Sequence, residues 1–303
     1  MRLVIEGAIG ANMSRKIVAG LQALAAIGLL FLASSMPAMA ERTVRIAFRA
    51  QIGDAAFKCG TSYPGVGTSA ATVTPTDLRF YVSAVSLIDA QGRRVPVQLT
   101  QDGLWQYRDV VLMDFEDGSG PCADGGNPGL NDTVIGTAPD GNYVGLAFTV
   151  GLPFDLDHAD ATLAPSPLNF SALFWAWAPG YRFFKFDLTT DASKVATGGE
   201  TGFSIHLGST GCDAASMTAV PSHCSNPNLV SVELPRFDPT RDAVVLDLKQ
   251  ALSGADVSRN TPNTAPGCMS EQSDPDCRSV FAAFGLPIGT QPAKPQTVFR
   301  TGR

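Results

Sequence analysis

The sequence predicts an all-β protein, an antiparallel β-sandwich with long loops held by disulfide bonds. Short apolar or alternating runs recur along the chain, clusters of Gly, Pro, Asn and Asp separate them, and helical periodicity is scarce. Roughly nine or ten such runs follow one another at the spacing typical of sandwiches. A single domain of this class can span residues 41–303.

The clearest strands alternate between apolar and polar positions, as in residues 43–52 and 202–209. In residues 202–209, alternation places His206 on one face and Phe203, Ile205 and Leu207 on the other. Further strands are expected from apolar runs bounded by turn residues, at 78–89, 142–154, 229–237 and 242–248.

Three segments carry more specific expectations. Residues 93–99 and 103–115 are expected to form a hairpin across Thr100–Gly103. Residues 174–188 should form a broken pair of strands, interrupted at a Pro-Gly step. About the last fifteen residues are expected to form a loosely held tail.

The N-terminus is expected to be a cleaved signal peptide covering residues 1–40. Arg15 and Lys16 precede an apolar run from Ile17 to Leu32, which is short for a membrane span. Ala38–Ala40 then has the small-x-small pattern that signal peptidase reads. An uncleaved anchor is the alternative interpretation. With cleavage, the protein is periplasmic or secreted.

Charge restricts the class of partner. Removing residues 1–40 changes the 22 basic and 28 acidic residues to 19 and 27, so the net charge goes from −6 to −8. An acidic protein with scattered Lys and Arg is poorly suited to nucleic acid, whose phosphates demand clustered cations. Cations and neutral molecules are better partners.

All cysteines lie in the expected exported part: Cys59, Cys122, Cys212, Cys224, Cys268 and Cys277. An even count outside the cytoplasm indicates disulfides, but sequence alone does not choose among their pairings. Short loops favour Cys212 with Cys224 and Cys268 with Cys277, which leaves Cys59 with Cys122. A zinc site is the competing interpretation, and it would need closely spaced CxxC pairs that the sequence lacks.

Signatures of common enzymes are missing, since the chain has no GxSxG elbow, phosphate loop or HExxH motif. We therefore expect a protein that is not an enzyme. An acidic loop offers Asp114, Glu116, Asp117 and Asp124 for a structural calcium ion, but without the ordered spacing of an EF-hand. A solvated turn is the alternative for that loop.

Two histidines are candidate ligands. His206 has small neighbours on its strand face, which leaves room for a ligand, and His158 is flanked by Asp157 and Asp160. Carboxylates beside an imidazole commonly hold it in one tautomer at metal sites. An ordinary surface role is the alternative for each, and His223 is assigned that role.

Two tryptophans lie in the stretch FWAWAPGY, residues 174–181. Trp175 and Trp177 share a face if the segment is extended. They predict either core packing or an exposed stacking platform, which would make the protein a secreted carbohydrate-binding sandwich.

Several motifs together resemble the MbnP-like family over about residues 43–287. They are FKCG (57–60), DLRFYVSAVSLID (77–89), DFEDGSGPC (114–122), GLAFTVGLPFDLDHAD (145–160), SPLNFSALFWAWAPGYRFFKFD (166–187), HLGSTGC (206–212) and PGCMS (266–270). Members are exported proteins, also described as a four-cysteine "metallo-mystery pair" family, encoded beside a di-haem peroxidase partner.

The resemblance implies a periplasmic β protein that binds copper, as Cu(I) or Cu(II). It implies that a MauG-type di-haem enzyme oxidises one tryptophan to kynurenine, which then holds copper with two histidines. Carried over, the ligands are His158, His206 and one of Trp175 and Trp177 after oxidation. The family usually has Asn before the first histidine, and Asp157 here adds charge near the expected site.

Overall fold

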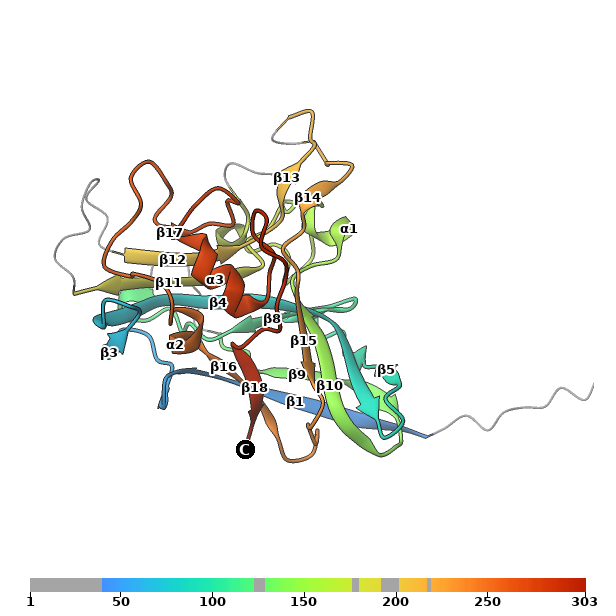
Figure 1. Cartoon of the computed structure of the whole chain (residues 1–303). Helices are drawn as coiled ribbons and strands as arrows, with labels where there is room; N and C mark the ends of the chain where they lie inside the picture. The colour runs from blue at the N-terminus through green and yellow to red at the C-terminus, as the bar shows by residue number, and fades with distance from the viewer. Residues whose placement is uncertain (1–39, 123–128, 176–179, 192–201, 217–218) are drawn as a thin grey trace, which may run out of the picture. The chain divides into compact units, whose positions relative to one another are not determined.

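The computed structural model describes residues 40–122, 129–175, 180–191, 202–216 and 219–303, and within them strands dominate (Figure 1). A six-stranded sheet has the order β18 (Phe299–Gly302), β16 (Ala243–Asp247), β1 (Glu41–Ile52), β9 (Thr133–Pro139) and β6 (Gln98–Leu99), with β2 (Ala55–Ala56) beside β1. A ten-stranded sheet has the order β15 (Val230–Leu234), β10 (Tyr143–Val150), β4 (Ala71–Asp89), β11 (Phe184–Thr190), β12 (Gly202–Leu207) and β17 (Gly267–Cys268).

Smaller elements complete the second sheet and its loops. β3 (Tyr63–Val66), β5 (Arg94–Pro96) and β8 (Val110–Asp114) pair with β4, and β7 (Gln106–Tyr107) pairs with β8. β13 (Thr210–Cys212) and β14 (Cys224–Asn226) form a separate hairpin. The α-helices of the described residues are α1 (Phe154–Asp157), α2 (Leu248–Ala251) and α3 (Cys277–Phe284), and the 3-10 turns are Gly120–Cys122 and Ser171–Leu173.

The predicted all-β sandwich is confirmed. Most strand pairs are antiparallel as expected, while β1 with β16 and β12 with β17 are parallel. Phenylalanine rings join the two sheets: Phe48 of β1 lies 5.4 Å from Phe148 of β10, and Phe299 of β18 lies 5.6 Å from Phe148, between ring centroids. Alternating strand residues thus build an aromatic core between the layers.

The opposite face of the ten-stranded sheet is charged. Register places Lys185 of β11 opposite both Arg79 of β4 and His206 of β12, and Asp187 opposite Asp77. Because side chains alternate along a strand, these residues share one face while their apolar neighbours enter the core. That face is buried, since Arg79 is fully covered and Lys185 is 9% exposed. Asp77 accepts hydrogen bonds from both of these cations.

The predicted hairpin between residues 93–99 and 103–115 is wrong. β5 pairs with β4 and β6 pairs with β9, so the first segment is divided between the two sheets. Residues 106–114 instead form their own hairpin of β7 and β8. Its turn contains Arg108 at a positive φ of 54°.

The expectation of a loose C-terminal tail is also wrong. β18 pairs with β16 in antiparallel register, and Val298 and Phe299 are buried in the core. The polar stretch before β18 suggested a tail, but its last apolar residues complete the edge of the six-stranded sheet.

Disulfides join Cys59 to Cys122, Cys212 to Cys224 and Cys268 to Cys277, which confirms the pairing that short loops favoured. Cys212 and Cys224 lie opposite each other on β13 and β14. Cys277 begins α3 and ties it to β17. Among the described helices, none has the length and hydropathy needed to cross a membrane.

The buried charges of the second sheet give a stability prediction. Replacing Arg79 by methionine (R79M) should lower the free energy of unfolding by about 3–5 kcal/mol, because Asp77 and Glu116 lose a buried cation. The control is R94M, which removes an exposed pair with Glu233 and should cost about 1 kcal/mol or less. Urea unfolding measures both, and equal losses would contradict a structural role for the buried pair.

Candidate metal centre

His206 sits near the end of β12 and is 4% exposed. Its Nε2 lies 2.7 Å from Oδ1 of Asp187 on the neighbouring strand. A carboxylate only accepts, so Nε2 is the donor, and in the neutral form of the ring the lone pair lies on Nδ1. Nδ1 is buried and has no hydrogen-bond partner among the described residues.

A line of charges fixes Asp187 in turn. Lys185 Nζ lies 2.9 Å from Asp187 Oδ2 and also bonds Asp77, which accepts from Arg79 Nε at 2.9 Å. Burial by itself raises the pKa of the Asp187 carboxyl, but His206 and Lys185 together hold that pKa well below its usual range. The carboxylate stays ionised at neutral pH and keeps the imidazole in the same orientation.

Trp175 packs directly on this histidine. The indole is 4% exposed, and its ring centroid lies 5.9 Å from that of His206 in an edge-to-face arrangement. Gly208 makes this approach possible, because a methyl group added there would lie 2.4 Å from Trp175 Nε1. On the other side, the guanidinium of Arg182 lies 5.5 Å from the indole ring. Burial lowers the pKa of Arg182 from its ordinary value.

His158 follows α1 directly and is also 4% exposed. Its Nε2 lies 3.3 Å from Sγ of Cys224 and 3.5 Å from Oδ2 of Asp157. Phe154, at the start of α1, covers the imidazole with ring centroids 4.4 Å apart. A methyl group added at Gly180 would lie 3.1 Å from Nδ1 of His158.

Asp157 connects the region of His158 to the end of β12. Its Oδ1 accepts from the backbone N–H of Tyr181 at 2.9 Å, and Oδ2 accepts from the Ser209 hydroxyl at 2.7 Å. Burial raises the pKa of this carboxyl, and the neighbouring His158 and the two hydrogen bonds oppose that rise. The Asp157 carboxyl, which the sequence predicts will add charge near the site, thus accepts one hydrogen bond at each oxygen.

The structure links three sequence-predicted residues, His158, Trp175 and His206, through Gly180 and the indole ring. Trp175 donates its backbone N–H to the Gly180 carbonyl at 2.9 Å, Gly180 adjoins His158, and Trp175 adjoins His206. The buried Nδ1 of His206, which has no hydrogen-bond partner among the described residues, fits a cation such as copper, which binds imidazole well. Trp177 lies outside the described residues.

Nothing in the described part of the acidic loop favours the predicted calcium site. Glu116 lies 3.8 Å from the buried guanidinium of Arg79 and accepts from the Gly118 N–H, while Asp117 accepts from Ser119. Asp114 is buried and also interacts with Arg79. Asp114 and Glu116 thus interact with the buried cation of the sheet, Asp117 caps its own loop, and Asp124 lies outside the described residues.

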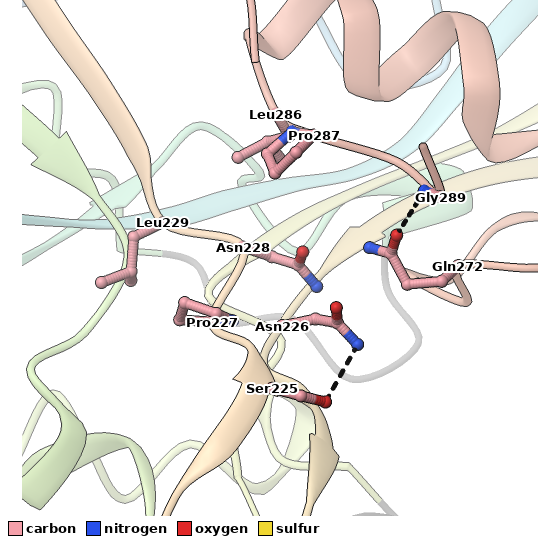
Figure 2. A pocket seen from close by; sticks show the side chains of 9 residues that line it. All are labelled: Ser225, Asn226, Pro227, Asn228, Leu229, Gln272, Leu286, Pro287 and Gly289. Atoms are coloured by element: carbon pink, nitrogen blue, oxygen red, sulfur yellow. Dashed lines mark hydrogen bonds between the residues drawn. The ribbon is translucent and has the colours of Figure 1, made fainter. Parts of the chain in front are cut away.

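Two other features lie apart from the candidate ligands. His223 is exposed and pairs with Asp213, 3.1 Å away, as an ordinary surface histidine. A pocket of about 350 Å³ lies between the segment after Cys224 and the region of Gln272 and Gly289 (Figure 2). None of its lining residues is a candidate ligand.

Sequence reasoning missed the residues that hold His206. Lys185 and Asp187 alternate with Phe184, Phe186 and Leu188, so period two places both charges on the face opposite the core. This pattern marks a buried polar face, although only the strand register shows that Asp187 meets His206.

The close contact at Gly208 can be tested by G208A. The added methyl would also lie 2.6 Å from the Tyr181 carbonyl oxygen, so we expect the free energy of unfolding to fall by about 1–3 kcal/mol. Displacement of Trp175 should also alter the near-ultraviolet circular dichroism signal. G141A is the control, because its methyl would meet nothing closer than 3.4 Å. Unchanged stability and spectrum in G208A would show that the indole does not pack there.

Comparisons with known proteins show the family to which the chain belongs. The MbnP family model matches residues 41–270. The solved structure of MbnP from Methylosinus trichosporium is similar with a TM-score of 0.78 and 34% sequence identity, over 87% of this chain and 99% of that one. No curated protein matches. Because the family match covers most of the chain and the solved structure is 34% identical over 87% of it, the chain belongs to the MbnP family.

Proposed function

We propose that this protein is an exported copper-binding protein whose ligands are His158, His206 and a kynurenine formed from Trp175. One observation carries the proposal: the buried indole of Trp175 packs on His206, whose Nδ1 lone pair is buried without a hydrogen-bond partner among the described residues. A lone pair in that state is stabilised by a bound cation.

Oxidation of the tryptophan supplies the third donor. An indole N–H only donates, so Trp175 as synthesised is a very poor ligand. Opening the five-membered ring frees an aryl amine, whose nitrogen has a lone pair. Two neutral imidazoles and this amine form a nitrogen-rich set, which suits copper.

A partner di-haem peroxidase is proposed as the oxidant of Trp175. The indole is 4% exposed, so a macromolecular enzyme cannot contact it directly, and electrons have to leave through the protein. Aromatic rings line the region, since Phe174 lies 5.0 Å from Tyr181 and the 43%-exposed Phe154 lies 4.4 Å from His158. These rings are the proposed relay.

Chain chemistry also supports export. The three disulfides are typical of an oxidising compartment such as the periplasm, consistent with cleavage of residues 1–40. In this proposal the protein binds copper and is the substrate of its partner, and it catalyses no reaction itself.

The carbohydrate-binding alternative is weaker. A stacking platform needs an exposed ring, whereas Trp175 is buried against His206 and Gly208. Trp177 alone would have to provide it, and that residue lies outside the described part of the chain.

Peptide mapping tests the maturation step. After co-expression with a di-haem partner, the peptide containing Trp175 should exchange one carbon atom for one oxygen atom, and the W175F variant should lose this product. Co-expression with a haem-deficient partner is the control. An unmodified Trp175, or modification confined to Trp177, would contradict the assignment.

Copper titration tests the ligands. H158A and H206A should each strongly weaken copper binding by the matured protein, whereas H223A, which changes an exposed histidine, should not. If both ligand variants bind copper as the unaltered protein does, the ligand assignment is wrong.

Asp187 should affect copper binding indirectly, by fixing the orientation and tautomer of His206. D187N removes the carboxylate that fixes the imidazole tautomer, so copper affinity should fall about 10–100-fold while the ligands remain. Electron paramagnetic resonance of the Cu(II) form should show altered nitrogen coupling. Asp155, an exposed carboxylate paired with Arg108, provides the matched control D155N. Equal affinity of D187N and D155N would contradict the positioning role.

A further inference from the structure

The Cys212–Cys224 disulfide lies against a buried histidine. Cys224 Sγ is 3.3 Å from His158 Nε2, where the β13–β14 hairpin meets the end of α1 (Figure 1). The donor atoms of His158, Cys212 and Cys224 all lie within 4.8 Å of one another. In the oxidised protein the two sulfurs are bonded to each other, so they offer no thiolate.

The nitrogen-to-sulfur separation is close to that of a thiolate metal site, and reduction lets the two sulfurs, no longer bonded, move apart. Tetrahedral bonds of 2.3 Å to sulfur and 2.0–2.1 Å to imidazole nitrogen place neighbouring ligand atoms about 3.5 Å apart. The nitrogen of His158 and the sulfur of Cys224 already stand at nearly this distance. Asp157 Oδ2, 3.5 Å from the same nitrogen, is at a similar spacing.

This disulfide is also the most accessible of the three. Cys212 and Cys224 are both half-buried, whereas Cys268 and Cys277 are fully buried, and in the remaining pair only Cys59 is half-buried while Cys122 is 1% exposed. Thiol–disulfide exchange requires access of the attacking thiolate to sulfur. A reductant should therefore open Cys212–Cys224 first.

Other contacts hold the hairpin once the bond is opened. Ser209 donates to Asp157 at 2.7 Å, and Asn228 donates to the Gly208 carbonyl at 2.8 Å, on either side of the hairpin. Thr210 pairs with Asn226 between the strands. Reduction thus frees two thiols without releasing the backbone that carries them.

We propose that reduction of Cys212–Cys224 creates a second metal site, in which both thiolates and His158 bind a thiophilic cation such as Zn(II), Cd(II) or Cu(I). A dithiol reductant transfers two electrons and two protons to the disulfide and becomes a disulfide itself. Binding of the cation then releases the two thiol protons, because thiolates are the ligands.

The thiolate site would have a consequence for copper binding by His158, and this consequence rests on the proposed copper function. A neutral imidazole has one nitrogen lone pair, so His158 serves either the nitrogen-rich site or the thiolate site, and the redox state of the hairpin decides which. Reduction should withdraw His158 from the site that contains His206.

Cadmium binding tests the proposal on protein made without a partner enzyme. A mild reductant should release two thiols per chain, mapped by alkylation to Cys212 and Cys224. The reduced protein should then bind one Cd(II) with a sulfur-to-cadmium charge-transfer absorption. H158Q should weaken this binding by about tenfold or more.

The controls separate this site from the copper site. H206A, altered at the other candidate ligand, should bind Cd(II) like the unaltered reduced protein, and the C212S/C224S double variant should lose the charge-transfer band. Circular dichroism verifies that each variant is folded. The proposal is overturned if the released thiols belong to another pair, if C212S/C224S binds Cd(II) equally well, or if H158Q binds undiminished. None of these outcomes depends on whether Trp175 is oxidised.

Discussion

The buried ion pairs on the outer face of the ten-stranded sheet determine how the side chains around them, including His206, are oriented. Asp77, Arg79, Lys185 and Asp187 alternate with core residues on β4 and β11, so the fold that buries the phenylalanines also buries these charges. A buried charge has to be paired and hydrogen-bonded. This line of charges ends at His206, whose Nε2 is held by Asp187 and whose ring packs edge-to-face with Trp175.

Trp175 and Asp157, which precede β11 in the chain, pack at the His206 end of this face, and two glycines allow close contacts there. Gly208 admits the indole of Trp175 at a distance that a side chain would block, and Gly180, at a φ of +150°, lies close to the imidazole of His158. Asp157 then joins the covering segment to the end of β12 through Tyr181 and Ser209. The candidate ligands are thus held by packing and hydrogen bonds before any metal is bound, which is the condition for a preorganised site.

His158 stands between two kinds of donor chemistry. On the Nδ1 side lies Gly180, whose carbonyl accepts the backbone hydrogen bond of Trp175. On the Nε2 side lies the sulfur of Cys224. Membership of the MbnP family, with 34% identity to a solved member, accounts for the shared sandwich. The chain differs from the family's usual sequence at Asp157, beside His158, so the contacts of these two residues are the part of the site that is specific to this chain.

The sequence by itself determined the all-β class, the main strands, the disulfide pairing that short loops favour and the two histidines worth examining, because alternation and loop length are local properties. Strand pairing is not local. Residues 93–99 pair with β4 and β9 rather than with the next segment, and the C-terminal residues complete a sheet edge. Only the tertiary structure brought Asp187 to His206, Arg79 to Glu116 and His158 to Cys224, since each contact joins segments whose separation in the chain carries no signal of their meeting.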